Sequence, residues 1–273
     1  MSFDLFSFAG KRVVVTGGAS GVGAALIRLL DSLGAPEVIV LDVQEPTGLS
    51  ASQRWLPTDL GDKAAIDAAV AQLGAVEVLF NNAAVAGTVA PAKLFAVNVL
   101  ALRHLTETVT AQMAPGGVVV NTSSTAGGQW NARLAAINEV LDIEDWDKAL
   151  AWFVDKQGTL GIDSYSFSKE CVQVYTLRKA SSLGERGLRM NSVAPSPIDT
   201  PLLKDFRESW SDKVIDFTAN AAGGLATPEE IAQVLAFLAV EASSQVNGVN
   251  LLADGGSSAG FLTGTIDTSP LRS

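Results

Sequence analysis

Short runs of branched aliphatic residues alternate with longer segments rich in alanine and leucine, and this alternation limits the fold more than any other feature of the chain. The runs RVVVT at 12–16, EVIVLD at 37–42 and VEVLFN at 76–81 are apolar at most positions. Such continuous runs are typical of strands buried on both faces of a parallel sheet. The strand–helix–strand repetition therefore predicts an α/β fold, a doubly wound sheet of about seven parallel strands with helices on both faces.

The same pattern gives the other elements and the domain count. We expect further strands at 54–56, 117–122, 188–193 and 249–252, and helices at 22–33, 63–73, 91–113, 166–183 and 228–241. No linker or low-complexity run interrupts them. The 273 residues are therefore expected to form one domain, 1–273.

Charge and composition exclude several classes of function. The formal net charge of −10, without a basic patch, disfavours nucleic acid as a partner. A lone Cys171 and a lone His104 leave no basis for a disulfide or a metal site, so no metal is expected. We find no secretory leader and no run near the ~18 apolar residues of a membrane span. A cytoplasmic protein that binds no membrane is the expectation.

One long segment breaks the alternation. About forty residues separate the predicted strand ending at Thr122 from the predicted helix near Tyr165. Two helices are expected within it, at 131–141 and 144–156, so 128–163 is interpreted as a helical insertion. A packed surface hairpin and a lid over a ligand site both remain open.

A glycine-rich turn follows the first strand. Thr16-Gly17-Gly18-Ala19-Ser20-Gly21-Val22-Gly23 leads directly into a helical pattern. Glycines there permit a tight turn and close approach of the backbone to a pyrophosphate, which the helix N-terminus favours electrostatically. Asp42 ends the second strand, 19 residues after Gly23. A carboxylate at this place can accept both ribose hydroxyls of NAD and would repel the 2′-phosphate of NADP, so NAD is the expected cofactor.

Further motifs lie in the order found in a known family. They are Asp59-Leu60, Asn81-Asn82-Ala83-Ala84, Asn98, Asn121-Thr122-Ser123-Ser124, Tyr165-Ser166-Phe167-Ser168-Lys169, Asn191-Ser192-Val193-Ala194-Pro195, Thr200 and Asp254-Gly255-Gly256. Together with the glycine turn they resemble the short-chain dehydrogenase/reductase family over roughly residues 9–257. The resemblance implies a Rossmann-type fold and a nicotinamide cofactor. The implied cofactor-binding residues are Gly17, Ser20, Gly21, Val22, Gly23, Asp42, Asp59, Leu60, Asn82, Tyr165, Lys169, Ile198 and Thr200.

Both tyrosines stand four residues before a lysine, so the family's Tyr–Lys pair has two candidates. Lys169 precedes Asn191 by 22 residues, whereas Lys179 precedes it by only 12, which is too short for a helix and a turn. Tyr165 and Lys169 are therefore assigned to the chemistry, and Tyr175 to packing. Ser124 fits the family's Ser-x-x-Gly pattern better than its neighbour Ser123.

The resemblance also implies how these residues act. Tyr165 would be the general acid or base, with its pKa lowered by the Lys169 ammonium and by the oxidised nicotinamide. Ser124 would hold the substrate oxygen, and Asn98 a water that links Lys169 to solvent. The catalytic set is thus Asn98, Ser124, Tyr165 and Lys169.

Two positions depart from the family pattern. Ala84 and Ser196 stand where the family has glycine, which would strain the backbone if either position required a positive φ.

The long insertion is similar to that of the bacterial 3α-hydroxysteroid dehydrogenase/carbonyl reductase and coniferyl-alcohol dehydrogenase branch. The resemblance implies an NAD-dependent oxidoreductase acting on a hydrophobic secondary or benzylic alcohol (cyclic, steroid or aryl) and its carbonyl partner. A homo-oligomer is expected: the insertion would cover one family interface and leave a dimer through the last strand and the helix at 228–241, with a tetramer as the alternative. A non-catalytic NAD-binding protein and a non-redox enzyme of the same fold are the rival hypotheses.

Overall fold

The computed structural model describes residues 5–269, so the two ends of the predicted 1–273 domain lie outside it. Seven parallel strands form one sheet in the order β3-β2-β1-β4-β5-β6-β7. Their bounds are β1 Arg12–Thr16, β2 Glu37–Asp42, β3 Gln53–Pro57, β4 Val78–Asn81, β5 Val118–Thr122, β6 Arg189–Pro195 and β7 Asn250–Ala253. The predicted fold class is confirmed, and each predicted strand forms within two residues of its expected bounds.

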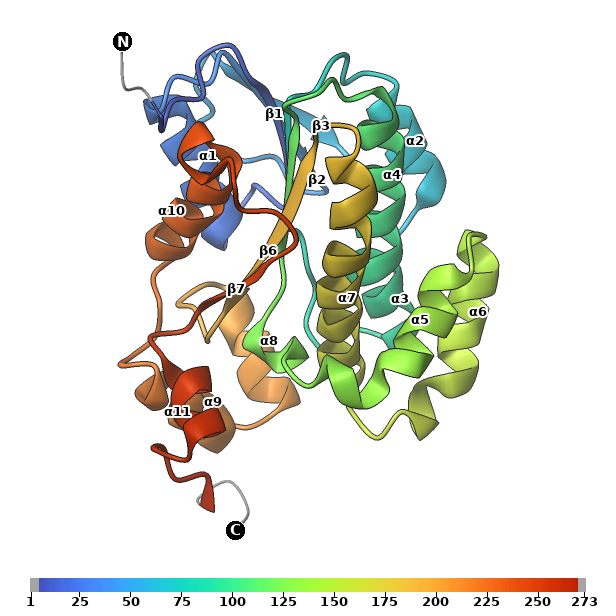
Figure 1. Cartoon of the computed structure of the whole chain (residues 1–273), viewed down its shortest axis with the longest axis vertical. Coiled ribbons are helices and arrows are strands. Elements are labelled where there is room, and N and C mark those ends of the chain that lie inside the picture. Colours follow the sequence, from blue (N-terminus) through green and yellow to red (C-terminus); the bar gives the residue numbers. More distant parts are fainter. Residues whose placement is uncertain (1–4, 270–273) are drawn as a thin grey trace.

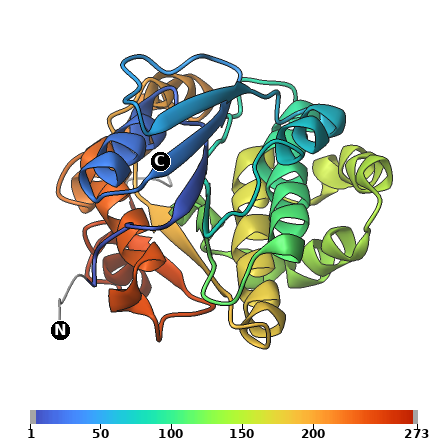
Figure 2. The same cartoon turned by 90° about the horizontal axis from the view of Figure 1, so that it is seen from above.

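Helices cover both faces of the sheet (Figures 1 and 2). Figure 1 shows α1 and α10 on one side and α2, α4 and α7 on the other. The helices are α1 Gly21–Ser32, α2 Lys63–Val70, α3 Pro91–Phe95, α4 Leu102–Gln112, α5 Leu134–Asp142, α6 Trp146–Lys156, α7 Ser164–Gly184, α8 Leu202–Ser209, α9 Asp212–Ala221, α10 Pro228–Ala239 and α11 Ser257–Thr263. None of them, among the residues described, is long and apolar enough to cross a bilayer.

Strand side chains alternate between the two helical layers. Val13 and Val15 belong to the apolar cluster under α1 and α10, whereas Val14 belongs to the cluster under α2, α4 and α7. Both faces of β1 are therefore buried, as the continuous apolar run predicts.

The helix predicted at 91–113 contains a wider turn. α3 and α4 are joined by a π-helical segment at Ala96–Ala101, which contains Asn98. π-helical turns often mark functional sites, and apolar periodicity alone does not reveal them.

The insertion forms an outer layer against α7 (Figure 1). Phe153 of α6 stacks on Phe95 of α3 with ring centroids 4.1 Å apart, and Phe167 of α7 lies 6.1 Å from Phe153. Arg133 and the fully buried Glu170 of α7 form an ion pair, with Nε donating to Oε2 over 2.7 Å. The body of the insertion is thus packed on α7, as a surface hairpin would be.

Candidate active site

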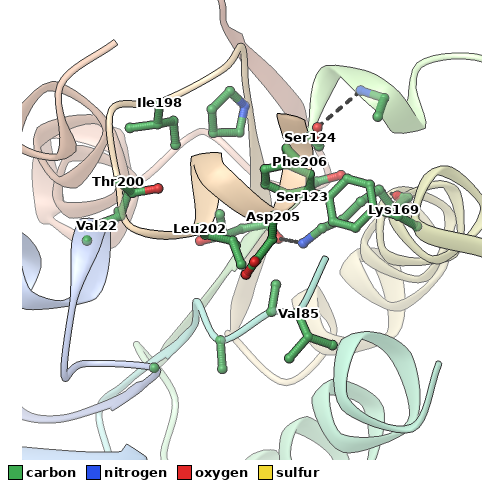
Figure 3. A pocket seen from close by; sticks show the side chains of 18 of the residues that line it. Val22, Val85, Ser123, Ser124, Lys169, Ile198, Thr200, Leu202, Asp205 and Phe206 are labelled. Atoms are coloured by element: carbon green, nitrogen blue, oxygen red, sulfur yellow. Dashed lines mark hydrogen bonds between the residues drawn. The ribbon is translucent and has the colours of Figure 1, made fainter. Parts of the chain in front are cut away.

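A cavity of about 1210 Å³ runs along the carboxyl ends of the strands, from Asp42 of β2 to Trp210 beyond α8. Figure 3 shows part of its lining, from Val22 and Thr200 to Lys169 and Phe206. Ligand sites in open α/β sheets lie at this edge. The volume exceeds the ~300–1,000 Å³ of ordinary small-molecule sites, so a dinucleotide and a second small molecule fit together.

Three positions of the first turn require glycine, because a side chain there would clash or strain the backbone. Gly17 has φ +71°, and a Cβ there would lie 2.7 Å from Ala83 Cα. A Cβ on Gly23 would lie 1.9 Å from the Gly17 carbonyl oxygen, and Gly21 has φ +53°. Ser20 caps α1 with extended backbone and no side-chain capping bond, so the first amides of α1 remain available to an anion.

Asp42 lies beside this turn. One carboxylate oxygen accepts a hydrogen bond from Ala19 N at 3.0 Å and the other accepts one from Gln44 N at 3.0 Å. The next residue, Val43, is exposed and uncharged. This end of the cavity, which Asp59 and Leu60 also line, therefore carries acidic and neutral side chains where a 2′-phosphate would need a cation.

Asn82 joins the end of β4 to the glycine turn. Its amide nitrogen donates to the Gly17 carbonyl at 3.1 Å, and its backbone N–H donates to Thr16 Oγ1 at 3.0 Å. Ile198 and Thr200 reach the cavity from the other side, and Thr200 lies close against Gly21. Apart from Gly23, which packs behind the turn, the predicted cofactor residues all line the cavity.

Tyr165, Lys169 and Ser124 converge farther along the cavity. Lys169 Nζ donates to the Thr122 carbonyl at 2.9 Å and lies 5.6 Å from the centroid of the Tyr165 ring. The Ser124 hydroxyl lies close enough to Tyr165 to lower its pKa, whereas Ser123 Oγ donates to the Lys169 carbonyl at 3.3 Å. This geometry supports Ser124 over Ser123 as the serine that faces a substrate.

The Ser-x-x-Gly spacing has a packing reason. A Cβ on Gly127 would lie 2.7 Å from the carbonyl oxygen of Lys169. The glycine therefore lets the short 3₁₀ turn Thr125–Gly127 press against α7, which brings Ser124 to Tyr165.

Burial controls the ionisation of the pair. Burial raises the pKa of Tyr165 above its usual range, although the hydrogen bond with Ser124 acts the other way. The lowering of the Tyr165 pKa that was expected from Lys169 is therefore not found in the polypeptide itself. Burial also lowers the pKa of Lys169 to about 8. A phenolate at Tyr165 needs further positive charge nearby, such as that of an oxidised nicotinamide.

The lowered pKa of Lys169 predicts a pH-dependent stability. The unfolded chain holds this proton up to about pH 10.5 and the folded chain only to about pH 8, so the free energy of unfolding should rise with pH across this window. Relative to Lys169→Met, the wild type should gain about 3 kcal/mol between these values. Urea titrations of both proteins at several pH values measure this gain, and parallel profiles would contradict it.

Asn98 is buried and does not line the cavity. Its Oδ1 accepts a hydrogen bond from Val85 N at 2.9 Å, and its Nδ2 donates to Val85 O at 3.0 Å and to Ser168 Oγ at 3.2 Å. The side chain thus ties the loop after β4 to α7. Its expected role in holding a water stays a prediction.

The two departures from the family pattern cause no strain. No residue other than glycine has a positive φ in the described part of the chain, so Ala84 and Ser196 fit ordinary backbone. Tyr175 is buried outside the cavity, among Val172 and Met190.

Two aromatic side chains that contact Tyr165 come from a segment that the sequence patterns did not single out. Phe206 and Trp210 meet the Tyr165 ring edge-on, with centroids 4.8 and 5.6 Å away. Helices α8, α9 and α11 supply this end of the cavity, and the insertion contributes Gln129, Ile162 and Asp163 at its margins. Leu202, Phe206 and Trp210 follow helical spacing, which is the signal that could have revealed α8.

Comparison with known proteins agrees with this geometry. Residues 11–136 match the family model described as short chain dehydrogenase, and residues 149–258 match the one described as Enoyl-(Acyl carrier protein) reductase. Coniferyl-alcohol dehydrogenase of Pseudomonas sp. (strain HR199 / DSM 7063) is 35% identical over 90% of this chain and 96% of its own. Cis-4-hydroxycyclohexanecarboxylate dehydrogenase of Sinomonas cyclohexanicum is 34% identical, over 93% and 98%.

A solved structure resembles the whole chain. The 3-alpha-hydroxysteroid dehydrogenase from Pseudomonas sp. B-0831, complexed with NADH, has a TM-score of 0.79 at 27% identity, covering 93% of this chain and 99% of that one. The expected likeness to the coniferyl-alcohol and hydroxysteroid dehydrogenase branch is therefore confirmed.

Proposed function

Because the chain belongs to the short-chain dehydrogenase/reductase family, we propose that it interconverts a hydrophobic secondary or benzylic alcohol and the corresponding carbonyl compound, with NAD as cofactor. The observation that carries this proposal is the convergence of Tyr165, Lys169 and Ser124 in the cavity that also contains the glycine turn. Relatives named as alcohol and hydroxysteroid dehydrogenases support alcohol chemistry, and cyclic, steroid and aryl alcohols are the proposed substrates.

The residues present fit a nicotinamide dinucleotide. The turn at Gly17 and Gly23 leaves no room for a Cβ, and the amides that open α1 suit a pyrophosphate. Lys169 is proposed to bind the nicotinamide ribose, and a bound nicotinamide would accept or supply the hydride.

The chain's own residues handle the proton and the orientation of the substrate. In oxidation, Ser124 holds the substrate hydroxyl and Tyr165 Oη takes its proton, while the Lys169 ammonium stabilises the phenolate. In reduction, Tyr165 returns the proton to the carbonyl oxygen. Asn98 is proposed to support this site through a water near Lys169.

The preference for NAD rests on Asp42. Asp42→Asn keeps the side-chain shape and removes the charge that would oppose a 2′-phosphate. We expect the wild type to favour NAD over NADP by about 100-fold in kcat/KM, near 2.8 kcal/mol, and the variant to lose most of this preference. Steady-state rates with both cofactors test this. If the ratio of kcat/KM for NAD to that for NADP is unchanged in the variant, a residue other than Asp42 determines the cofactor preference.

The test of the proposed function is NADH formation with a panel of cyclic, steroid and aryl alcohols. Turnover of at least one class, with the carbonyl product formed in equal amount, is the expected result. NAD binding without turnover of any alcohol or carbonyl compound would favour a non-catalytic NAD-binding protein instead.

A dimer is the proposed assembly. β7 is an edge strand with Leu252 46% exposed, Phe237 of the neighbouring α10 is 38% exposed, and the insertion covers the outer face of α7. The expected mass in solution is twice the 28.3 kDa of the chain. Phe237→Glu should give monomers, and Val154→Glu on α6 should not. A tetramer that Val154→Glu splits would contradict this interface.

The cytoplasm is the proposed location, which the free thiol of Cys171 fits.

A further inference from the structure

Helix α8 turns one face toward the cavity. Leu202, Asp205, Phe206 and Ser209 all line it, at spacings of three, four and seven residues. Lys204 and Glu208 lie on the exposed side of the helix. This arrangement makes α8 the element that presents side chains to a substrate held at Tyr165, because Phe206 already contacts the tyrosine ring.

Four carboxylates line the cavity, and three of them already accept hydrogen bonds from the protein. Asp42 accepts hydrogen bonds from Ala19 N and Gln44 N, Asp59 accepts one from Gly61 N at 2.8 Å, and Asp163 caps α7 through Ser166. The carboxylate of Asp205 makes no hydrogen bond or ion pair within residues 5–269. Figure 3 shows it extending from α8 into the space between Leu202 and Val85.

A half-buried, unpartnered carboxylate needs a hydrogen-bond donor, since its remaining acceptor capacity is lost when a substrate displaces water. The neighbouring aromatic rings of Phe206 and Trp210 suit a flat or cyclic substrate body. Because Ser124 and Tyr165 take the oxygen that reacts, we assign Asp205 to another group of the substrate.

We propose that Asp205 determines specificity by accepting a hydrogen bond from a second hydroxyl group of the substrate, so that the preferred substrates are uncharged ring alcohols with a hydroxyl away from the reacting carbon. This inference rests on the proposed function and names its substrate class. Anionic substrates are disfavoured, because a carboxylate would face Asp205. Asp163 and Lys169 also line the cavity near Tyr165, but they are hydrogen-bonded to Ser166 and to the Thr122 carbonyl. Lys93 of α3 is exposed, so that water and salt screen it.

The test uses three matched benzylic alcohols that differ at the far end of the ring. They are 1-phenylethanol, 1-(4-hydroxyphenyl)ethanol and 1-(4-carboxyphenyl)ethanol. In the wild type, kcat/KM for the hydroxylated alcohol should exceed that for 1-phenylethanol by roughly 10- to 100-fold, as expected for a hydrogen bond to a charged group. The carboxylated alcohol should be the poorest of the three.

The variants separate charge from shape. Asp205→Leu should abolish the preference for the hydroxylated alcohol, and Asp205→Asn should keep part of it and improve the rate with the carboxylated alcohol. Glu208→Gln, on the exposed side of the same helix, is the control and should resemble the wild type with all three alcohols.

A binding measurement keeps this inference separate from the proposed reaction. Calorimetry on the protein with NADH compares 4-hydroxyacetophenone with acetophenone and needs no turnover. Tighter binding of the hydroxylated ketone, lost in Asp205→Leu, would support Asp205 even if no alcohol were oxidised, in which case only the proposed function fails. The same preference for hydroxylated compounds in wild type and Asp205→Leu would overturn the inference.

Discussion

Tyr165→Phe is expected to lower kcat for alcohol oxidation by about 10²- to 10⁴-fold, the usual contribution of a general acid or base. Phenylalanine fills the same space beneath Phe206 and Trp210 but has no hydroxyl to exchange a proton with the substrate. The dissociation constant for NADH should change by less than about tenfold, since the glycine turn and Asp42 are untouched.

Tyr175→Phe is the matched control for this prediction. Tyr175 lies on the same helix, also four residues before a lysine, but it is buried outside the cavity, and its hydroxyl donates to the Arg103 carbonyl over 3.5 Å. Its variant should keep the wild-type kcat. Equal losses in the two variants would show that α7 tolerates neither change and would remove the case for Tyr165.

Arg133→Met is expected to cost about 3–5 kcal/mol of the free energy of unfolding. The Glu170 side chain is fully buried, and Arg133 is its ion-pair partner. The same contact holds the pKa of Arg133 above its usual range. Without the guanidinium a carboxylate is left unpaired inside the protein, next to Lys169. The double variant Arg133→Met, Glu170→Leu removes both charges and should recover most of the loss.

Arg178→Met supplies the comparison. Arg178 also joins α7 to the insertion, through Asp142, but both side chains are well exposed, at 41% and 64%. Exposed pairs contribute about 0–1 kcal/mol. Denaturant unfolding of the four proteins measures these differences. If Arg133→Met costs no more than Arg178→Met, or if the double variant is as unstable as the single one, the buried pair does not anchor the insertion.

The sheet could be predicted well from the sequence because its inner strands are buried on both faces and are therefore apolar at nearly every position. Val13, Val14 and Val15 are buried whichever face they meet, so a continuous apolar run suffices to identify β1. The site residues at the strand ends could be placed for a related reason: parallel strands bring their carboxyl ends to one edge, so Asp42 and Ser124 had to lie along the same cavity.

The missed features depend on contacts between distant segments. Helix α8 has only eight residues and is largely polar, and its pattern becomes meaningful only when Phe206 is seen against Tyr165. The pairing of Arg133 with Glu170 links positions 37 residues apart through a buried contact that no local pattern records. Burial, which a sequence does not show, raises the pKa of Tyr165 in the polypeptide, and the lowering expected with an oxidised nicotinamide bound stays a prediction.

The central claim is that this chain moves a hydride from an alcohol carbon to a nicotinamide beside Tyr165. The direct measurement uses 1-(4-hydroxyphenyl)ethanol carrying deuterium on its carbinol carbon, with purified protein and NAD, and determines the mass of the NADH formed. We expect the NADH to carry one deuterium, at a rate that Tyr165→Phe reduces by at least about 100-fold. NADH without deuterium, or no NADH from any alcohol although NAD binds, would contradict the account.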